Sequence, residues 1–262
     1  MSIMILVFIV LAIAILMTMT GRGGGNFYVL ALALSGMGMH QAAASGQFIL
    51  MLTSLAGMLI FQKNKMIDWK LALVIDPPTD IMAFVGGYLS DYIGGTELKL
   101  VFSVLLIIAG IIMLIKVEDK AINKEKRFGY WHREFQGHHY TVNLWLAIPV
   151  TALVGLFSGA LGISGGSFKV PLMVLFCGVP MRIAVGTSSA MVAATALMGF
   201  TGHLSQGHFD PHTAIILAIA ALIGGLIGGK FALKTKPKNL KKIFALTTIA
   251  ASVIMFINAL TT

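Results

Sequence analysis

The chain has 262 residues, of which 57% are hydrophobic and only 11% are charged, and its formal net charge is +9. A soluble domain is about 45–50% apolar and about 25% charged, so the composition excludes an ordinary soluble protein and predicts an integral membrane protein. The single cysteine, Cys177, excludes an internal disulfide framework, and the positive charge lies mostly in short loops, where it reports orientation and does not indicate nucleic-acid binding.

Apolar runs follow one another along the chain in two groups of similar layout. The first group covers about 1–19, 26–36, 41–61, 70–90 and 98–116, and the second covers about 143–161, 167–178, 183–203, 212–233 and 240–260. Most runs reach the ~20 residues that a helix needs to cross a bilayer, whereas 26–36 and 167–178 cover roughly half of the ~30 Å hydrocarbon core. Residues 1–19 lack a basic leader and a small-residue cleavage site, so we expect a mature membrane segment and not a signal peptide.

The second group repeats the first. A shift of 142 residues aligns Thr53 with Thr195, Gly57 with Gly199, and Gly86-Gly87 with Gly228-Gly229. A shift of 141 aligns the glycine-rich turns, with Gly21, Gly24 and Gly25 over Gly162, Gly165 and Gly166. An internal repeat in an apolar chain is typical of membrane transporters, whose substrate sites lie between the repeats.

Loop charges predict that the two halves have opposite orientations. The loop 62–70 is basic, while its counterpart 204–212 has no Lys or Arg; 91–97 is acidic, while its counterpart between the last two runs is lysine-rich. Because basic loops stay in the cytoplasm, equivalent loops lie on opposite sides. The basic central loop 116–139 is then a cytoplasmic tether, both termini lie outside, and each half crosses the membrane an odd number of times. The segments 26–36 and 167–178 are either re-entrant or short crossings.

Two glycine-rich breaks, 21–26 and 162–167, precede the half-length segments. Asn26 and Ser167 are good N-caps, and free N–H groups at a helix start need a partner inside a membrane and attract anions. The candidate ligands here are the backbone amides and side chains of Gly24, Gly25, Asn26, Gly165, Gly166 and Ser167. The alternative is that the glycines only permit tight helix packing. Because two breaks stand at equivalent positions, we favour a substrate site.

Other polar residues in the runs give further candidates. Thr187 and Ser188, and their counterparts Ser45 and Gln47, offer hydroxyl and amide donors for an oxyanion, or hydrogen bonds between helices. Lys169 either draws an anion into the site or extends to an interface.

Two carboxylates interrupt the run 70–90. Asp76 and Asp80 flank Pro77-Pro78 and align with Ala218 and Leu222, so they break the repeat. They either carry protons for coupling or cap a helix that the prolines break, and we favour the second interpretation. His40 and His203 make no cluster with metal-ligand spacing, so we expect no metal and no cofactor.

The sequence resembles the sulfite exporter TauE/SafE family of anion permeases. The resemblance is carried by the glycine-rich stretch 155–171, which ends in Val170-Pro171, and by the Ala-Val-Gly-Thr-Ser stretch 184–188. The duplicated layout extends it over nearly the whole chain. It implies export or uptake of small sulfur- or carbon-containing anions, such as sulfite, organosulfonates, thiosulfate or carboxylates.

We therefore expect an all-α membrane protein of two inverted repeats, 1–116 and 141–262, joined by a basic linker, 117–140. The expected function is secondary transport of a small oxyanion across the plasma membrane by alternating access, with proton coupling. The partners are then the anion and the lipid bilayer, and the sequence leaves open whether a homodimer forms. The alternatives are an anion channel, or an intramembrane enzyme or assembly factor; no nucleophile–base pair or nucleotide-binding loop supports an enzyme or a pump.

Overall fold

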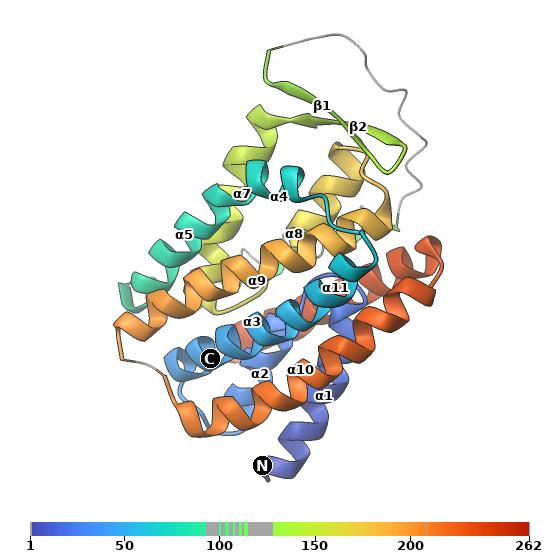
Figure 1. The fold of residues 1–262 in the computed structure, drawn as a ribbon. Helices are drawn as coiled ribbons and strands as arrows, with labels where there is room; N and C mark the ends of the chain where they lie inside the picture. Colours follow the sequence, from blue (N-terminus) through green and yellow to red (C-terminus); the bar gives the residue numbers. More distant parts are fainter. Residues whose placement is uncertain are drawn as a thin grey trace.

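The structure, a computed structural model, describes residues 2–92, 128–207 and 209–261 and scattered positions between 100 and 114. The described part is mostly helical and contains one β-hairpin (Figure 1). Its first half holds α1 (Ile3–Thr18), α2 (Gly25–Leu34), α3 (Met39–Lys63), α4 (Trp69–Ile75), α5 (Pro77–Tyr88) and the 3₁₀ turn η1 (Ser90–Tyr92). The remainder holds β1 (Tyr130–Phe135), β2 (His138–Asn143), α7 (Leu144–Leu161), α8 (Gly166–Pro171), the π-helical turn η2 (Leu172–Phe176), α9 (Met181–Ser205), α10 (Pro211–Lys234) and α11 (Pro237–Thr261).

Helix lengths agree with the predicted division into full and half-length segments. Within the described ranges, α3, α7, α9 and α10 are long and apolar enough to cross a bilayer. The helix α2 has 10 residues, and α8 with η2 forms the short apolar segment Gly166–Phe176. The prediction of two half-length helices after glycine-rich breaks is therefore confirmed. Most of the run 98–116 lies outside the described residues.

The run 70–90 is two helices, because prolines interrupt it. The helix α4 ends at Ile75, and α5 begins at Pro77. Proline has no backbone N–H and restricts the residue before it, so it stands readily at a helix start and poorly inside one. The interpretation that the prolines break this run is confirmed, but the side chain of Asp76 makes no capping hydrogen bond to α5. Its carboxylate is therefore available to another element.

Helix pairs from the two halves form the core. The long helices α3 and α9 pack against each other, α10 lies against α1 and α3, and α5 lies against α7 and α9. Glycines permit this packing: a Cβ atom on Gly86 of α5 would overlap the carbonyl oxygen of Leu156 in α7, and one on Gly228 of α10 would overlap that of Ile15 in α1. Backbones therefore touch at both crossings, as small residues allow in membrane proteins.

The predicted linker contains an antiparallel hairpin, so the expectation of an all-α protein needs correction. Strands β1 and β2 pair from Tyr130 with Asn143 to Phe135 with His138. The amide of Thr141 donates to the carbonyl of Cys177 at 3.2 Å, which joins the hairpin to the segment before α9. Alternating polar and aromatic residues favour a strand, and the expectation of a tether without secondary structure is wrong for residues 130–143.

Three contacts join loops or element ends that are distant in the sequence; residues 93–97 of the acidic loop lie outside the described part. The hairpin binds the loop before α4 through Arg133 and Asp68, and Arg182 at the start of α9 donates to the carbonyl of Thr235 between α10 and α11 at 3.2 Å. The end of α5 meets the loop after α9, where Gln206 donates to the carbonyl of Tyr88 at 3.1 Å. In Figure 1 the hairpin and the N-terminus lie at opposite ends of the molecule.

Candidate functional site

The two glycine-rich breaks lie against each other inside the protein. The carbonyl oxygen of the Asn26 side chain accepts a hydrogen bond from the backbone N–H of Ser164 at 3.1 Å. The hydroxyl of Ser164 donates to the backbone carbonyl of Arg22, and accepts from the amide of Gly166 at 3.2 Å. One side chain of each break thus binds the backbone of the other. The break 21–26 and the break 162–167 form one structure, which we call the junction.

Glycine is needed where the breaks touch. A Cβ atom on Gly25, the first residue of α2, would lie 2.8 Å from the amide nitrogen of Ser164. One on Gly166, the first residue of α8, would lie 3.0 Å from the carbonyl oxygen of Gly21. Gly24 has φ +98°, a left-handed conformation that side chains disfavour. The starts of both short helices therefore meet at the junction, and Gly165 and the buried Ser167 flank that meeting point.

The four hydroxyl and amide candidates on α3 and α9 separate into different environments. Ser188 donates to the carbonyl of Gly21 at 2.8 Å and belongs to the junction. The hydroxyl of Thr187, the residue before Ser188, instead accepts from the amide of Asp68 at 3.0 Å. The side-chain amide of Gln47 donates to the carbonyl of Ser158 at 3.0 Å. Among the described residues, the side-chain oxygen of Gln47 and the buried hydroxyl of Ser45 have no hydrogen-bond partner. Only Ser188 of the four therefore contacts the breaks through a hydrogen bond.

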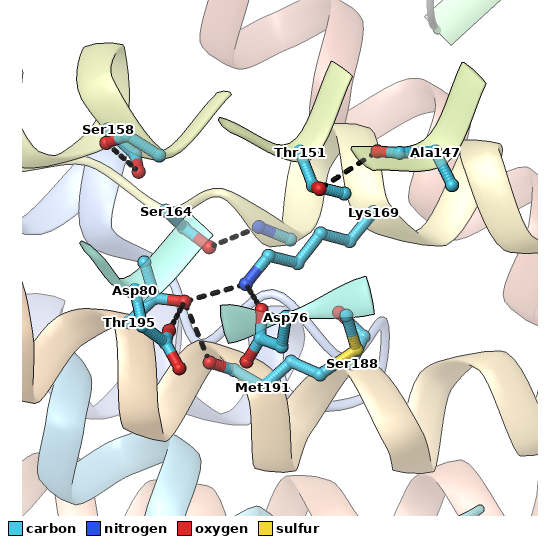
Figure 2. Close-up of polar contacts among 12 residues, drawn as sticks. Asp76, Asp80, Ala147, Thr151, Ser158, Ser164, Lys169, Ser188, Met191 and Thr195 are labelled. Atoms are coloured by element: carbon cyan, nitrogen blue, oxygen red, sulfur yellow. Dashed lines mark hydrogen bonds and ion pairs between the residues drawn. The ribbon is translucent and has the colours of Figure 1, made fainter. Parts of the chain in front are cut away.

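A buried charged cluster lies beside the second break. Figure 2 shows Lys169 extending from α8 toward Asp76, Asp80 and Thr195. The ammonium of Lys169 forms an ion pair with Asp76 and donates to the hydroxyl of Thr195 at 2.6 Å. That hydroxyl also lies 2.7 Å from Asp80 and 2.9 Å from the carbonyl of Met191. We call Lys169, Asp76, Asp80 and Thr195 the charge cluster.

Neither interpretation of Lys169 foresaw this arrangement. Its side chain is 1% exposed, so it does not extend to an interface, and its charge is already paired with Asp76. The two carboxylates belong to α4–α5 of one half and the cation to α8 of the other. The cluster therefore connects the halves across the packed helices.

A small cavity of about 50 Å³ borders the junction. Its wall includes Asn26 and Phe27 from α2, Ile163 from the second break, and Ala251 and Ile254 from α11. Asn26 is a strongly polar residue in an otherwise apolar wall. Because its carbonyl oxygen is bonded to Ser164, its amide N–H groups remain as donors for a small ligand.

Comparison with known proteins identifies the family to which this arrangement belongs. The family model of the sulfite exporter TauE/SafE matches residues 6–255. The chain belongs to the sulfite exporter TauE/SafE family. It is 26% identical over 211 residues to the probable membrane transporter protein YunE of Bacillus subtilis, covering 79% of this chain and 77% of that protein. It is 24% identical over 222 residues to the probable membrane transporter protein YdhB of the same organism, covering 83% and 85%.

A plant relative carries the family name. The sulfite exporter TauE/SafE family protein 6 of Arabidopsis thaliana is 32% identical over 93 residues, which cover 35% of this chain and 22% of that protein. No solved structure matches the chain. Family membership makes this TauE/SafE protein a multi-pass membrane transporter, and its residues 6–255 span both breaks and the charge cluster.

Arg22 is a buried residue of this TauE/SafE protein that the sequence analysis passed over. It lies within the first break and is 2% exposed. Its guanidinium donates to three threonine hydroxyls and to the sulfur of Met17, and it lies 4.5 Å from the ring centre of Phe244. An arginine between two apolar runs was the available signal, because charges at membrane depth are costly and mark functional positions.

Outside the membrane-length helices, Asp68 anchors the hairpin. Its carboxylate accepts two hydrogen bonds from Arg133, both at 2.9 Å, and one from Tyr140. Burial alone would raise the pKa of Asp68, but the hydrogen bonds from Arg133, Tyr140 and the amide of Leu71 outweigh it and lower the pKa. Burial and the bond to Asp68 raise the pKa of Tyr140. We call Asp68, Arg133 and Tyr140 the hairpin anchor.

Proposed function

We propose that this TauE/SafE protein is a secondary transporter that moves a small oxyanion by alternating access. The observation that carries the proposal is the junction, where the starts of two short helices from different halves meet in the interior. Paired broken helices at a repeat interface are the usual location of a transporter's substrate site. The sulfur-containing anion is suggested by the family description and by the name of the Arabidopsis relative.

The anion ligands in this proposal come from both breaks. Asn26 lines the cavity and offers its amide N–H groups, and the backbone amides near Gly24, Gly25, Gly165 and Gly166 add the positive ends of two helices. Ser167 and Ser188 supply hydroxyls. Thr187 does not contact the anion in this proposal, because its hydroxyl accepts from the amide of Asp68 at the start of α4. Ser45 and Gln47 lie in α3 and support the site through helix packing.

Reciprocal contacts support an approximate two-fold relation between the halves. A contact between two residues of different halves recurs between their repeat equivalents, with the halves exchanged. The contact of Gly86 with Leu156 has its counterpart in Gly228 with Ile15. The contact of Gly57 with Ser189 has its counterpart in Gly199 with Gln47, and that of Gly21 with Val185 in Gly162 with Ala43. Combined with the opposite loop charges, this pattern favours inverted repeats that rock about the junction.

The charge cluster is our candidate for proton coupling. It contains one cation and two carboxyl groups, so it carries a net charge of −1 when all are ionised, and one bound proton makes it neutral. In the first half, Tyr28 takes the place of Lys169 and its hydroxyl lies 3.1 Å from that of Thr53, the equivalent of Thr195. Since α10 offers Ala218 and Leu222 where α4–α5 offers Asp76 and Asp80, the equivalent position around Tyr28 and Thr53 has neither the ammonium nor the carboxyl groups.

A channel is the second candidate for this family member, and the closed junction argues against it. The breaks are hydrogen-bonded to each other, so a continuous pore through them requires those bonds to separate. In a carrier the same bonds are exchanged for bonds to the anion during each cycle. We therefore prefer the carrier.

A binding screen tests the proposal. Purified protein is titrated calorimetrically with sulfite, sulfoacetate, taurine, thiosulfate and small carboxylates, and we expect at least one anion to bind saturably. Asn26→Leu should weaken its affinity by about tenfold, since it removes the cavity donors. Asn64→Leu, which alters an exposed amide at the end of α3, is the matched control. If no anion binds, or if Asn26→Leu binds as the wild type does, the junction is not the site.

A further inference from the structure

We propose that Arg22 is the principal cation of the anion site, and that Thr247 and Thr248 of α11 occupy its guanidinium when no anion is bound. This inference rests on the proposed function and assigns a residue and an element to the same site. It follows from the partners of Arg22, from the contrast with Lys169, and from the place of α11 in the cavity wall.

Every described partner of the guanidinium is uncharged. Nε donates to Thr20 at 3.1 Å, and Nη1 donates to Thr248 at 2.6 Å. Nη2 donates to Thr247 and to the sulfur of Met17. No ion pair within the described ranges includes Arg22. A buried cation whose partners are all neutral retains its full positive charge for a ligand.

The contrast with Lys169 decides which cation serves the anion. Lys169 is paired with Asp76, so an anion approaching it meets the carboxylate as well. Arg22 instead lies over the ring of Phe244, which shields one face of the guanidinium and leaves its edge for hydrogen bonds. A planar guanidinium presents paired N–H donors that match an oxyanion better than an ammonium does.

The route to Arg22 runs along α11. Thr247, Ala251 and Ile254 are spaced by four and three residues, so they share one face of this helix. Ala251 and Ile254 belong to the cavity wall together with Asn26, and Thr247 contacts the guanidinium. A shift of α11 along this face would join the cavity to Arg22 and free two donors on its edge.

The threonines are suited to being displaced. The hydroxyls of Thr247 and Thr248 donate to backbone carbonyls of their own helix, among them that of Phe244. Each hydroxyl can therefore accept from Arg22 in one state and keep its own helical bond when an anion takes the guanidinium. The anion that fits is small and has at least two oxygens on one centre, as a sulfonate, sulfite or carboxylate does.

Variants of Arg22 test the assignment. In proteoliposomes the wild type is assayed for saturable uptake of radiolabelled thiosulfate and sulfoacetate. For the anion that it carries, Arg22→Gln should weaken binding by at least about tenfold, and Arg22→Lys should lose less because it keeps the charge without the paired donors. Arg182→Gln, which removes a cation at the start of α9, should bind as the wild type does. Equal affinity in Arg22→Gln would overturn the assignment while leaving the transporter itself intact.

A second measurement covers the case in which Arg22→Gln does not fold. A Cys177→Ser/Thr247→Cys protein carries one thiol beside Arg22, and its rate of reaction with a small methanethiosulfonate reagent is measured with and without saturating anion. We expect the anion to change this rate severalfold, because it replaces the contact between α11 and Arg22. An unchanged rate in protein that still transports the anion would refute the assignment. Absence of transport in the wild type would instead refute the proposed function.

Discussion

At the scale of single residues, the charge cluster explains why Lys169 is tolerated in an apolar interior. An isolated ammonium there would be costly, but an ion pair with Asp76 and a hydrogen bond to Thr195 surround it. Such a cluster gives little net stability, whereas removing one member leaves an uncompensated buried charge. The members should therefore depend strongly on one another.

Replacing Lys169 should reveal this dependence. Lys169→Met leaves Asp76 without its cation and should lower the free energy of unfolding by about 3–5 kcal/mol. Adding Asp76→Asn removes the unpaired charge and should recover much of that loss. Thermal unfolding in detergent measures both variants, with Lys234→Met at the exposed end of α10 as control. Independent, additive effects of the two substitutions would contradict the cluster.

A second prediction at this scale concerns Asp80. It is bonded to Thr195 and is not the direct partner of Lys169, so Asp80→Asn should leave the protein folded. Because the substitution removes the excess negative charge, uptake of anion should no longer respond to a pH difference across the membrane. Proteoliposome uptake with and without that difference measures the effect. A response equal to the wild type would exclude Asp80 from coupling.

At the scale of elements, the hairpin anchor predicts a pH dependence of stability. The pKa of Asp68 is lowered in the folded protein, so its contribution is present above the unfolded value of about 4 and is lost as the pH falls through the folded value. As the pH falls below about 4, the melting temperature should therefore fall more steeply in the wild type than in Asp68→Asn. Parallel curves for the two proteins would show that the anchor contributes nothing.

Helix crossings give a second prediction at this scale. Gly86→Ala would force a methyl group against the backbone of α7 and should destabilise the protein by about 1–3 kcal/mol. Gly228→Ala should do the same against α1. Gly38→Ala is the matched control, since a Cβ atom there meets no other atom within 4 Å. If all three variants have the same free energy of unfolding, the close helix crossings do not contribute to stability.

Some elements of the fold could be predicted from the sequence and others could not. The half-length helices followed from run length and glycine position, both of which are local. The hairpin was not foreseen, because its strands are stabilised by Asp68, which lies far away in the chain. The equivalence of the breaks predicted a substrate site between them, and their direct hydrogen bonds were not predicted. The partners of Lys169 and Arg22 depend on side-chain packing between elements that are distant in the sequence.

At the scale of the whole molecule, the two halves share contacts but differ in charge. The glycine contacts recur with the halves exchanged, while Arg22 belongs to the first break and Lys169 to α8, the short helix of the second half. We infer that a shared scaffold provides the motion and that its unequal charges provide the anion and proton sites. Anion transport and coupling should then respond to different variants, Arg22 for the former and Asp80 for the latter.

Counterflow of labelled anion in proteoliposomes tests the central claim most directly, because it detects a site that is exposed to one side at a time. Vesicles loaded with unlabelled anion should accumulate external labelled anion transiently, at a rate that saturates with concentration, and Asn26→Leu should reduce this accumulation. Labelled flux that never saturates and is unaffected by internal anion would contradict a carrier site at the junction.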